Sequence, residues 1–412
     1  MTPRYSFLDH LTCPKCYERY SGHTLQGMCR CGSPLLVSYD IEGAKEALTK
    51  RGLSRRVKSL WRYHELLPLV HPENGVSLGE GMTPLLTARR SGEELGLRRL
   101  FIKDEGVLPT GTFKARGAAV GVSKAKELGV RAIAMPTNGN AGAAWSAYAA
   151  RAGIECYIGM PKDAPSVTMA ECLAYGAHLF LVDGHINQVG RMIERACSEG
   201  SAYNVSTLRE PYRVEGKKTM GFEVSEQLGW RNPDVVVYPT GGGVGLIGVH
   251  KAMQELAELG WTQGDMPRFV AVQSAGCAPV VEAWRKGARE CIPWENPKTV
   301  AFGINVPKPL GDFLILESLY DSRGCAVAVE DGEILKAQRT LGAKEGLFTC
   351  PEGASTLAAL NRLVSEGWID RDETVVLLNT GSGIKYPETV RVEVPLYRAD
   401  QSVTFDRSLD SA

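Results

Sequence analysis

The sequence predicts an α/β protein with two open parallel-sheet domains and a small cysteine-rich module at the N-terminus. Three observations predict this architecture. Short β-branched or apolar runs alternate with segments of helical period along most of the chain, as expected for parallel strands with right-handed crossovers. Three loops rich in glycine or small polar residues directly follow such runs. Four of the 11 cysteines lie near the N-terminus, and 412 residues suffice for two or more domains.

The composition is typical of a soluble globular protein. Hydrophobic residues make up 44% of the chain and charged residues 23%, and 47 basic side chains balance 47 acidic ones. This balance favours neither nucleic acid nor a membrane surface as a partner. The N-terminal segment lacks the apolar core of a signal peptide, and no apolar run reaches the length of a membrane span. We therefore expect a cytoplasmic protein, and we expect it to be a homodimer.

The N-terminal cysteines form two close pairs, Cys13 with Cys16 and Cys29 with Cys31. Two such pairs about a dozen residues apart can supply four thiolates to one zinc ion. Reduced cysteines without a metal are the alternative. In either case we expect a structural module, because no acid, base or open coordination position is evident beside it.

The remaining elements follow in order along the chain. After a helix and an irregular connection, a strand at residues 99–103 leads to a turn and then to a helix that begins at residue 118. The next strands are predicted at residues 132–135, 156–160, 178–182, 235–238, 269–272 and 375–378, and helices at residues 141–151, 168–175, 186–198 and 217–228. We expect three units: the module over residues 1–45, a smaller α/β domain over residues 118–212, and a larger one that combines residues 46–117 and 213–398.

Lys114 is the predicted catalytic residue. It lies in residues 109–117 (PTGTFKARG), a turn-rich stretch that runs into the helix. A lysine at such a junction, beside the apolar ring of Phe113, can be desolvated, so that its neutral amine forms an imine with an aldehyde. A surface lysine at the start of an amphipathic helix is the simpler alternative.

The loop at residues 239–248 (PTGGGVGLIG) joins a strand to a helix and predicts a phosphate site. Its backbone N–H groups would lie at the positive end of the helix dipole. The spacing of Gly243, Gly245 and Gly248 also matches a dinucleotide fingerprint. That fingerprint requires an acidic residue near the end of the next strand, where this chain has Gln273 and Ser274. A mononucleotide or a phosphorylated cofactor therefore fits better, with a plain tight turn as the alternative.

Two further loops follow strands in the same way. Residues 136–142 (PTNGNAG) bring polar side chains and backbone donors to a helix start, which suits a carboxylate, and Asn140 could donate to a phenolic oxygen. Residues 379–383 (NTGSG) place the hydroxyl of Thr380 at the carboxyl end of a strand, where it could share a hydrogen bond with a ring nitrogen. Either loop alone would be ordinary capping or a turn.

Together, an imine-forming lysine, a phosphate loop, a carboxylate site and a hydroxyl at the sheet end describe a pyridoxal-phosphate enzyme. The chain also resembles the fold-type II pyridoxal-phosphate enzymes, which are tryptophan synthase β-like, and among these the threonine synthase family. The motifs that carry the resemblance lie at residues 79–85 (GEGMTPL), 109–114 (PTGTFK) and 211–219 (PYRVEGKKT), and the cysteine module ending in GSPLL at residues 32–36 is similar to that of many members.

The resemblance implies a role for each candidate residue. Lys114 would carry the cofactor, and Gly241, Gly242, Gly243, Val244 and Gly245 would hold its phosphate. Asn140 would contact the pyridine hydroxyl and Thr380 the pyridine nitrogen. Thr137, Asn138 and Gly139 would bind the substrate carboxylate, and Arg213 and Lys218 its distal phosphate, with a structural salt bridge as the alternative for the last two.

By the same resemblance, the expected reaction is that of threonine synthase, which converts O-phospho-L-homoserine and water to L-threonine and phosphate. Three features differ from the family pattern: Ala115 replaces an aspartate, Ser382 replaces a histidine, and residues 206–210 (STLRE) replace an Asn-Ser-x-Asn pattern. The three consecutive glycines instead resemble threonine/serine dehydratases. A dehydratase-type β-elimination, another replacement lyase, and a non-enzymatic ligand-binding protein are therefore the alternatives.

Overall fold

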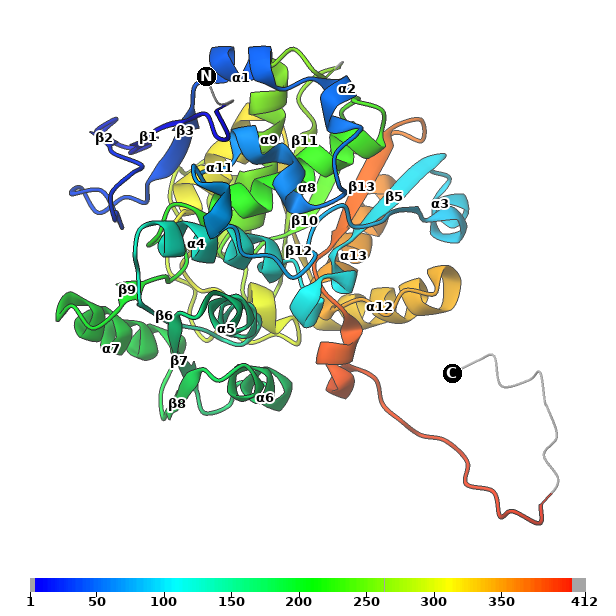
Figure 1. Cartoon of the computed structure of the whole chain (residues 1–412). Coiled ribbons are helices and arrows are strands. Elements are labelled where there is room, and N and C mark those ends of the chain that lie inside the picture. The colour runs from blue at the N-terminus through cyan, green and yellow to red at the C-terminus, as the bar shows by residue number, and fades with distance from the viewer. Residues whose placement is uncertain (1–3, 263, 402–412) are drawn as a thin grey trace.

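The computed structural model describes residues 4–262 and 264–401, and its largest element is a six-stranded sheet (Figure 1). The strand order is β12-β11-β10-β13-β5-β4. These strands are β4 (Leu85–Thr87), β5 (Arg99–Asp104), β10 (Val235–Pro239), β11 (Arg268–Ser274), β12 (Cys325–Val329) and β13 (Thr374–Asn379). The neighbouring pairs are parallel except that β4 runs antiparallel to β5 at the edge. The larger sheet is therefore mixed, whereas the sequence led us to expect a parallel one.

A second sheet of four parallel strands, in the order β8-β7-β6-β9, lies below the first in Figure 1. Its strands are β6 (Ala132–Pro136), β7 (Glu155–Pro161), β8 (His178–Val182) and β9 (Tyr203–Asn204). The helices associated with it are α4 (Lys114–Glu127), α5 (Asn140–Ala152), α6 (Ser166–Ala174) and α7 (Ile186–Ser198). The strands and helices predicted in this region are confirmed, whereas the three proposed domain boundaries stay a prediction.

Helices cover both faces of the large sheet, because its central strands are apolar on both sides. On one face, Val235 and Val237 pack with α12 (Asp331–Glu345) and α13 (Pro351–Ser365). On the other face, Val236 and Tyr238 pack with four helices, namely α8 (Arg213–Gln227), α9 (Val244–Glu258), α10 (Pro279–Arg285) and α11 (Asp312–Asp321). Successive residues of β10 thus serve opposite cores, as the period of two in a strand requires.

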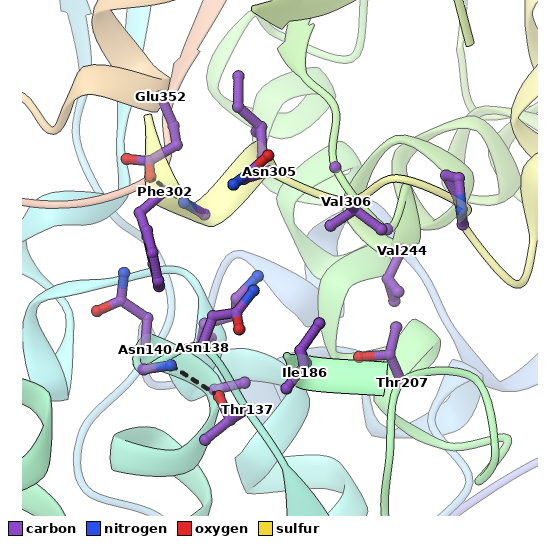
Figure 2. Close-up of a pocket in the computed structure, with 18 of the residues that line it drawn as sticks. Thr137, Asn138, Asn140, Ile186, Thr207, Val244, Phe302, Asn305, Val306 and Glu352 are labelled. Carbon is purple, nitrogen blue, oxygen red and sulfur yellow. Dashed lines mark hydrogen bonds between the residues drawn. The ribbon is translucent and has the colours of Figure 1, made fainter. Parts of the chain in front are cut away.

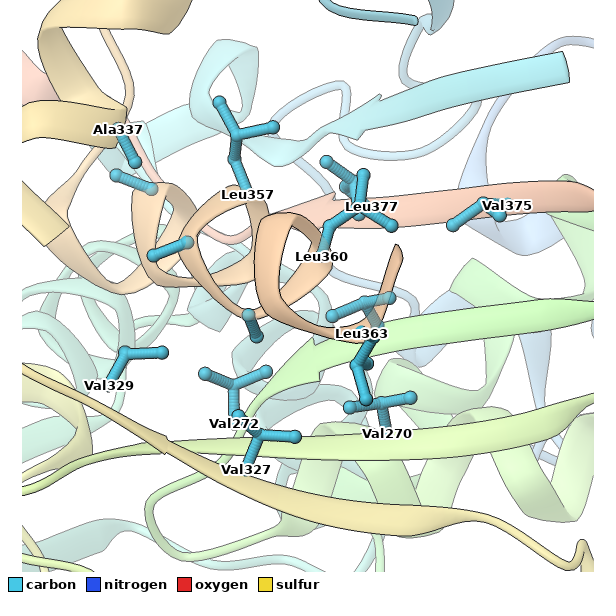
Figure 3. Packing of buried hydrophobic residues seen from close by; sticks show 14 of the residues in the cluster. Val270, Val272, Val327, Val329, Ala337, Leu357, Leu360, Leu363, Val375 and Leu377 are labelled. Atoms are coloured by element: carbon cyan, nitrogen blue, oxygen red, sulfur yellow. The ribbon is translucent and has the colours of Figure 1, made fainter. Parts of the chain in front are cut away.

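The core under α13 shows how this packing is made (Figure 3). In this view Leu360 lies toward Leu377 of β13 and Leu363 toward Val270 of β11, whereas Leu357 points away from β11; all three belong to one buried cluster. The three leucines are at most 3% exposed. Burial of each leucine stabilises the fold by about 1.5–3 kcal/mol relative to an exposed position. This packed layer supports the strands whose ends carry the three loops of the site.

The N-terminal module is a three-stranded antiparallel sheet of β1 (Leu8–Thr12), β2 (Arg19–Tyr20) and β3 (Leu36–Tyr39). The module contacts the four-stranded sheet at β9 and, on the side of the six-stranded sheet, the segment after α10. The hydroxyl of Tyr203 on β9 donates to the carbonyl of Gln26 at 2.6 Å, and Lys15 pairs with Glu290 at 2.6 Å. Three short helices complete the fold: α1 (Ile41–Ala47), α2 (Lys50–Leu53) and α3 (Arg89–Leu95).

The lysine loop differs from its prediction in one respect. Helix α4 begins at Lys114, not at residue 118, so the lysine is the first residue of the helix. The turn before it is formed by Thr110 and Gly111, whose φ angles are 63° and 65°. In residues 4–262 and 264–401, no helix is long and apolar enough to span a membrane.

Candidate active site

One cavity of about 430 Å³ joins Lys114 and the three loops that the sequence singled out. It lies between the carboxyl ends of strands from the two sheets, with walls from both. In Figure 2, Phe302, Asn305 and Glu352 on one wall face Asn138 and Asn140 on the other. The volume falls within the range of about 300–1,000 Å³ typical of small-molecule sites.

Backbone pairing holds the lysine loop against the loop after β13. The N–H of Phe113 donates to the carbonyl of Thr380 at 3.0 Å, and the N–H of Ser382 donates to the carbonyl of Gly111 at 2.9 Å. These two bonds lie just before Lys114 in the chain. The third loop therefore places Thr380 beside the lysine and also fixes the lysine's backbone.

The surroundings of Lys114 favour its neutral amine. Burial and, to a smaller extent, the nearby guanidinium of Arg213 together lower the pKa of Lys114 to about 8, although Glu352 and Cys350 oppose the shift. Its Nζ lies 4.2 Å from the centroid of the Phe113 ring. An amine with this pKa is partly deprotonated near neutral pH, which a nucleophile or proton acceptor requires.

The triple-glycine loop and the first turn of α9 form part of the cavity wall. Gly243 has φ +75°, and a Cβ there would lie 2.2 Å from Ile315. A Cβ on Gly245 would lie 1.7 Å from the hydroxyl of Tyr238. Only glycine fits at these two positions. The first N–H groups of a helix have no partner within the helix, so Val244 and Gly245 can offer theirs to an anion.

The loop after β6 caps α5. The hydroxyl of Thr137 accepts hydrogen bonds from the N–H groups of Gly139 and Gly142 at 3.0 and 3.2 Å. Thr137, Asn138, Gly139 and Asn140 all line the cavity. The capping role that the sequence left open is therefore present, and it shapes the loop that faces the cavity.

The residues predicted to bind the cofactor and the substrate meet in the cavity except for Lys218. Arg213 lines it, with its Nε donating to Glu210 at 2.5 Å. Lys218 instead lies within an ion cluster, 2.5 Å from Glu215 and 2.8 Å from Glu255, and is fully buried there. The structure thus places Lys218 in the salt-bridge arrangement that was its alternative and not in the lining of this cavity. Its neighbour Lys217 lines the cavity.

Several cavity residues were missed by sequence reasoning: Lys217, Tyr238, Cys350, Glu352 and Tyr386. Tyr238 had a usable signal, because it lies at the end of the strand before the glycine loop. Glu352 lies in the first turn of α13, and Tyr386 follows a short turn after β13, with no local motif around either. Cys350 lies 3.6 Å from the hydroxyl of Thr380, measured from Sγ.

The four module cysteines also come together, away from this cavity. Sγ of Cys13 lies 3.5 Å from that of Cys31, and Sγ of Cys16 lies 3.4 Å from that of Cys29. All four sulfur atoms lie within 4.8 Å of one another. Tetrahedral zinc with Zn–S bonds of about 2.3 Å requires sulfurs roughly 3.8 Å apart, so the cluster has suitable dimensions.

The residues around Lys114 fit a phosphorylated aromatic aldehyde. Within the described part of the chain, four buried polar atoms of the cavity have no hydrogen-bond partner: Asn140 Oδ1, Tyr238 Oη, Asn305 Oδ1 and Glu352 Oε2. Buried polar groups normally have partners, so this set indicates a polar ligand. The cavity also offers groups that match each part of pyridoxal phosphate. The N-terminus of α9 suits the phosphate, the amine of Lys114 suits the aldehyde, and the hydroxyl of Thr380 suits the ring nitrogen.

Curated relatives cover nearly the whole chain. A threonine synthase of Methanocaldococcus jannaschii is 38% identical over 377 residues, which are 91% of this chain and 93% of that protein. A threonine synthase of Methanosarcina acetivorans is 37% identical over 383 residues, 92% of this chain and 93% of that protein.

Solved structures share the fold. Maize serine racemase superposes with a TM-score of 0.63 at 22% identity, covering 73% of this chain and 88% of its own. Threonine deaminase isoform 2 from Solanum lycopersicum gives a TM-score of 0.63 at 19% identity, over 77% of this chain and 88% of its own. The sequence model of the family described as "Pyridoxal-phosphate dependent enzyme" matches residues 76–381. With its lysine, glycine loop and sheet-end hydroxyl in one cavity, the chain belongs to the pyridoxal-phosphate-dependent enzyme family.

Proposed function

We propose that this protein is a threonine synthase, which converts O-phospho-L-homoserine and water to L-threonine and phosphate. One observation carries the proposal. Lys114, whose pKa is lowered, lines the same cavity as the glycine-rich loop from Gly241 to Gly245, which is of the kind that binds phosphate. Relatives that bear this name align over more than nine tenths of the chain at 37–38% identity. Threonine deaminases appear among the structural neighbours at lower identity.

In this proposal, Gly241 to Gly245 bind the cofactor phosphate through backbone N–H groups. Asn140 binds the ring hydroxyl, and Thr380 shares a hydrogen bond with the ring nitrogen. Asn138 and Gly139 bind the substrate carboxylate, in a loop that Thr137 holds in shape. Arg213 binds the distal phosphate, and its contact with Glu210 orients the guanidinium.

The bound cofactor supplies an electron sink for the pair left at the substrate Cα when its proton is removed. The amine of Lys114 takes that proton, because its lowered pKa leaves it partly neutral near physiological pH. Removal of a second proton, from Cβ, provides the electron pair that breaks the Cγ–O bond and expels phosphate, and water later adds at Cβ. Arg213 neutralises the phosphate as it leaves, which favours departure of the anion. Phe302 lines the cavity, and in this proposal its apolar ring limits the water that reaches the substrate.

The assay that tests this function follows two products separately. The purified holoenzyme is incubated with O-phospho-L-homoserine and, in parallel, with L-threonine, and phosphate and 2-oxobutyrate are measured. Phosphate together with threonine supports a synthase. Formation of 2-oxobutyrate from threonine, with no phosphate released from O-phospho-L-homoserine, supports a dehydratase. No turnover of either compound supports a ligand-binding protein.

We also propose that Cys13, Cys16, Cys29 and Cys31 bind one structural zinc ion. The sulfur spacing supports it, as does the module's position between β9 and the segment that carries Glu290. A metal ion bound there would hold the module in the position that the contacts of Gln26 with Tyr203 and of Lys15 with Glu290 require.

For assembly and location, we propose a cytoplasmic homodimer. The exposed apolar side chains of Val392, Val394 and Leu396, each at least 77% exposed, support the dimer because a second copy could cover them. All eleven cysteines are free, which is usual in a reducing compartment. Sedimentation analysis measures the mass of the assembly directly.

A further inference from the structure

Lys217 is a buried amine that the reaction described above does not use. It lies on α8, is 3% exposed and lines the cavity. Its Nζ donates to the carbonyl of Phe113 and lies 4.1 Å from the centroid of that residue's ring. Lys114 approaches the same ring at 4.2 Å, so the two amines occupy one region of the cavity.

The path of the Lys217 side chain is built into the packing. A Cβ on Gly117 of α4 would lie 3.0 Å from Lys217 Cε, and a Cβ on Gly248 of α9 would lie 3.0 Å from Lys217 Cβ. The lysine therefore runs between two helices at positions where both carry glycine. Helix α9 is the one whose first turn follows the triple-glycine loop.

The charge of Lys217 has no carboxylate partner within the described residues, unlike the charges of the neighbouring Arg116 and Arg213. Arg116 pairs with Glu105 at 2.5 Å and with Glu223 at 2.6 Å. Arg213 pairs with Glu210 at 2.5 Å. A buried ammonium without an anion is costly, so a ligand that brings negative charge would relieve the cost.

We propose that Lys217 is an anion-binding residue of the cavity and that its ligand is a phosphate monoester dianion. This inference rests on the proposed function, in which two such groups enter the cavity: the phosphate of the cofactor and the distal phosphate of the substrate. Lys217 would give either one a charge-assisted hydrogen bond in addition to the backbone N–H groups or Arg213.

The electrostatics of the cavity without ligands agree with this role. Burial lowers the pKa of Lys217 well below its usual range, and so do the cations of Lys114 and Arg116 from α4 and of Arg213 from α8. The carboxylate of Glu105 opposes this effect of the cations, but it is paired with Arg116. A dianion would offset these cations and favour the protonated amine.

The test compares Lys217→Gln with Lys286→Gln, which removes an exposed lysine charge from the segment after α10. Each protein is resolved from its cofactor and titrated with pyridoxal phosphate and with pyridoxal, which lacks the phosphate, and binding is read from absorbance. The holoenzymes are titrated with inorganic phosphate, and binding is read from cofactor fluorescence. A charge-assisted hydrogen bond corresponds to about a 10- to 100-fold change in Kd.

If Lys217 binds the cofactor phosphate, Lys217→Gln weakens pyridoxal phosphate about 10- to 100-fold and leaves pyridoxal within about twofold. If it binds the substrate phosphate, only the affinity for inorganic phosphate falls by that factor. Either pattern supports the proposal, and unchanged affinities in both titrations overturn it. Should Lys217→Gln not fold, Lys217→Met is measured in the same way. Because these are binding measurements, they are independent of the turnover assay that tests the proposed function.

Discussion

The side-chain amide of Asn140 donates a hydrogen bond of 2.7 Å to the hydroxyl of Tyr386. That hydroxyl donates in turn to Oε1 of Glu352 at 3.0 Å, and Glu352 also accepts from the N–H of Gly303 at 2.5 Å. The chain of bonds connects α5, beside the small sheet, with α13, on the large one. It thus holds opposite walls of the cavity together and fixes the orientation of the Asn140 side chain.

Replacing Tyr386 with Phe removes both bonds of this hydroxyl while keeping the ring. We expect the affinity for pyridoxal phosphate to fall about 3- to 10-fold, since a neutral hydrogen bond contributes about 0.5–1.5 kcal/mol. The matched control is Tyr157→Phe, whose hydroxyl also donates to a carboxylate, that of Glu155, but on the surface. An unchanged Kd in Tyr386→Phe, measured by absorbance titration, would show that the bond chain does not orient Asn140.

The lowered pKa of Lys114 predicts how the rate of cofactor attachment depends on pH. The neutral amine reacts with the aldehyde, so attachment of pyridoxal phosphate to the cofactor-free protein should speed up as pH rises and reach half its maximum near pH 8. With the ordinary value of 10.5, the rate would still be rising well above pH 9. Stopped-flow absorbance over about pH 6.5–10 measures the midpoint, and a rate that is still rising steeply at about pH 10 contradicts the assigned environment.

We expect the buried ion pairs of Arg116 to stabilise the fold. Its guanidinium is fully buried between Glu105 and Glu223, and the pKa of Glu223 is about 2 because Arg116 and Lys103 outweigh the burial of the carboxyl. Arg116→Met leaves Glu105 without a cationic partner and Glu223 with Lys103 alone, and it should lower the free energy of unfolding by about 3–5 kcal/mol. Urea unfolding followed by circular dichroism measures this change.

The control for that experiment is Arg89→Met, which breaks an exposed pair with Glu93. An exposed pair of this kind contributes less than about 1 kcal/mol. If the two variants lose similar stability, the buried network does not have the role assigned to it.

The strands and the surface helices could be predicted because each leaves a local pattern. Helix α7 has the predicted bounds, 186–198, since Val189 and Ile193 are buried on one side while most of the rest is polar and exposed. Helix α8 lacks such a pattern, because residues 213–225 are all buried. Adjacent residues of a helix point about 100° apart, so nothing local could show that Lys217, and not Lys218, faces the cavity.

The three loops of the site could be predicted because each lies directly after its strand. The contacts between them could not, because they join distant parts of the chain: Asn140 and Tyr386 are 246 residues apart, and Lys385 and Glu171 are 214 apart. Glu352 belongs to the same class, since its partners are Tyr386 and Gly303. Only the folded sheets bring these residues together.

The cysteine module predicts one zinc ion per chain. Cys16→Ser should lose that zinc and lower the thermal midpoint, and a strong chelator should have the same effect on the native protein. Cys197→Ser is the control, because Cys197 is a half-buried free thiol on α7 outside the cluster. Elemental analysis that finds no zinc in protein purified from zinc-supplemented cells would contradict the proposed site.

The central claim is that Lys114 is the residue that carries pyridoxal phosphate in this cavity. Borohydride reduction of the holoenzyme, followed by digestion and mass spectrometry, tests it most directly. We predict that the reduced cofactor is found on the peptide that contains Lys114 and that Lys114→Ala yields no labelled peptide. A cofactor fixed to Lys217 or to any other lysine would contradict the account.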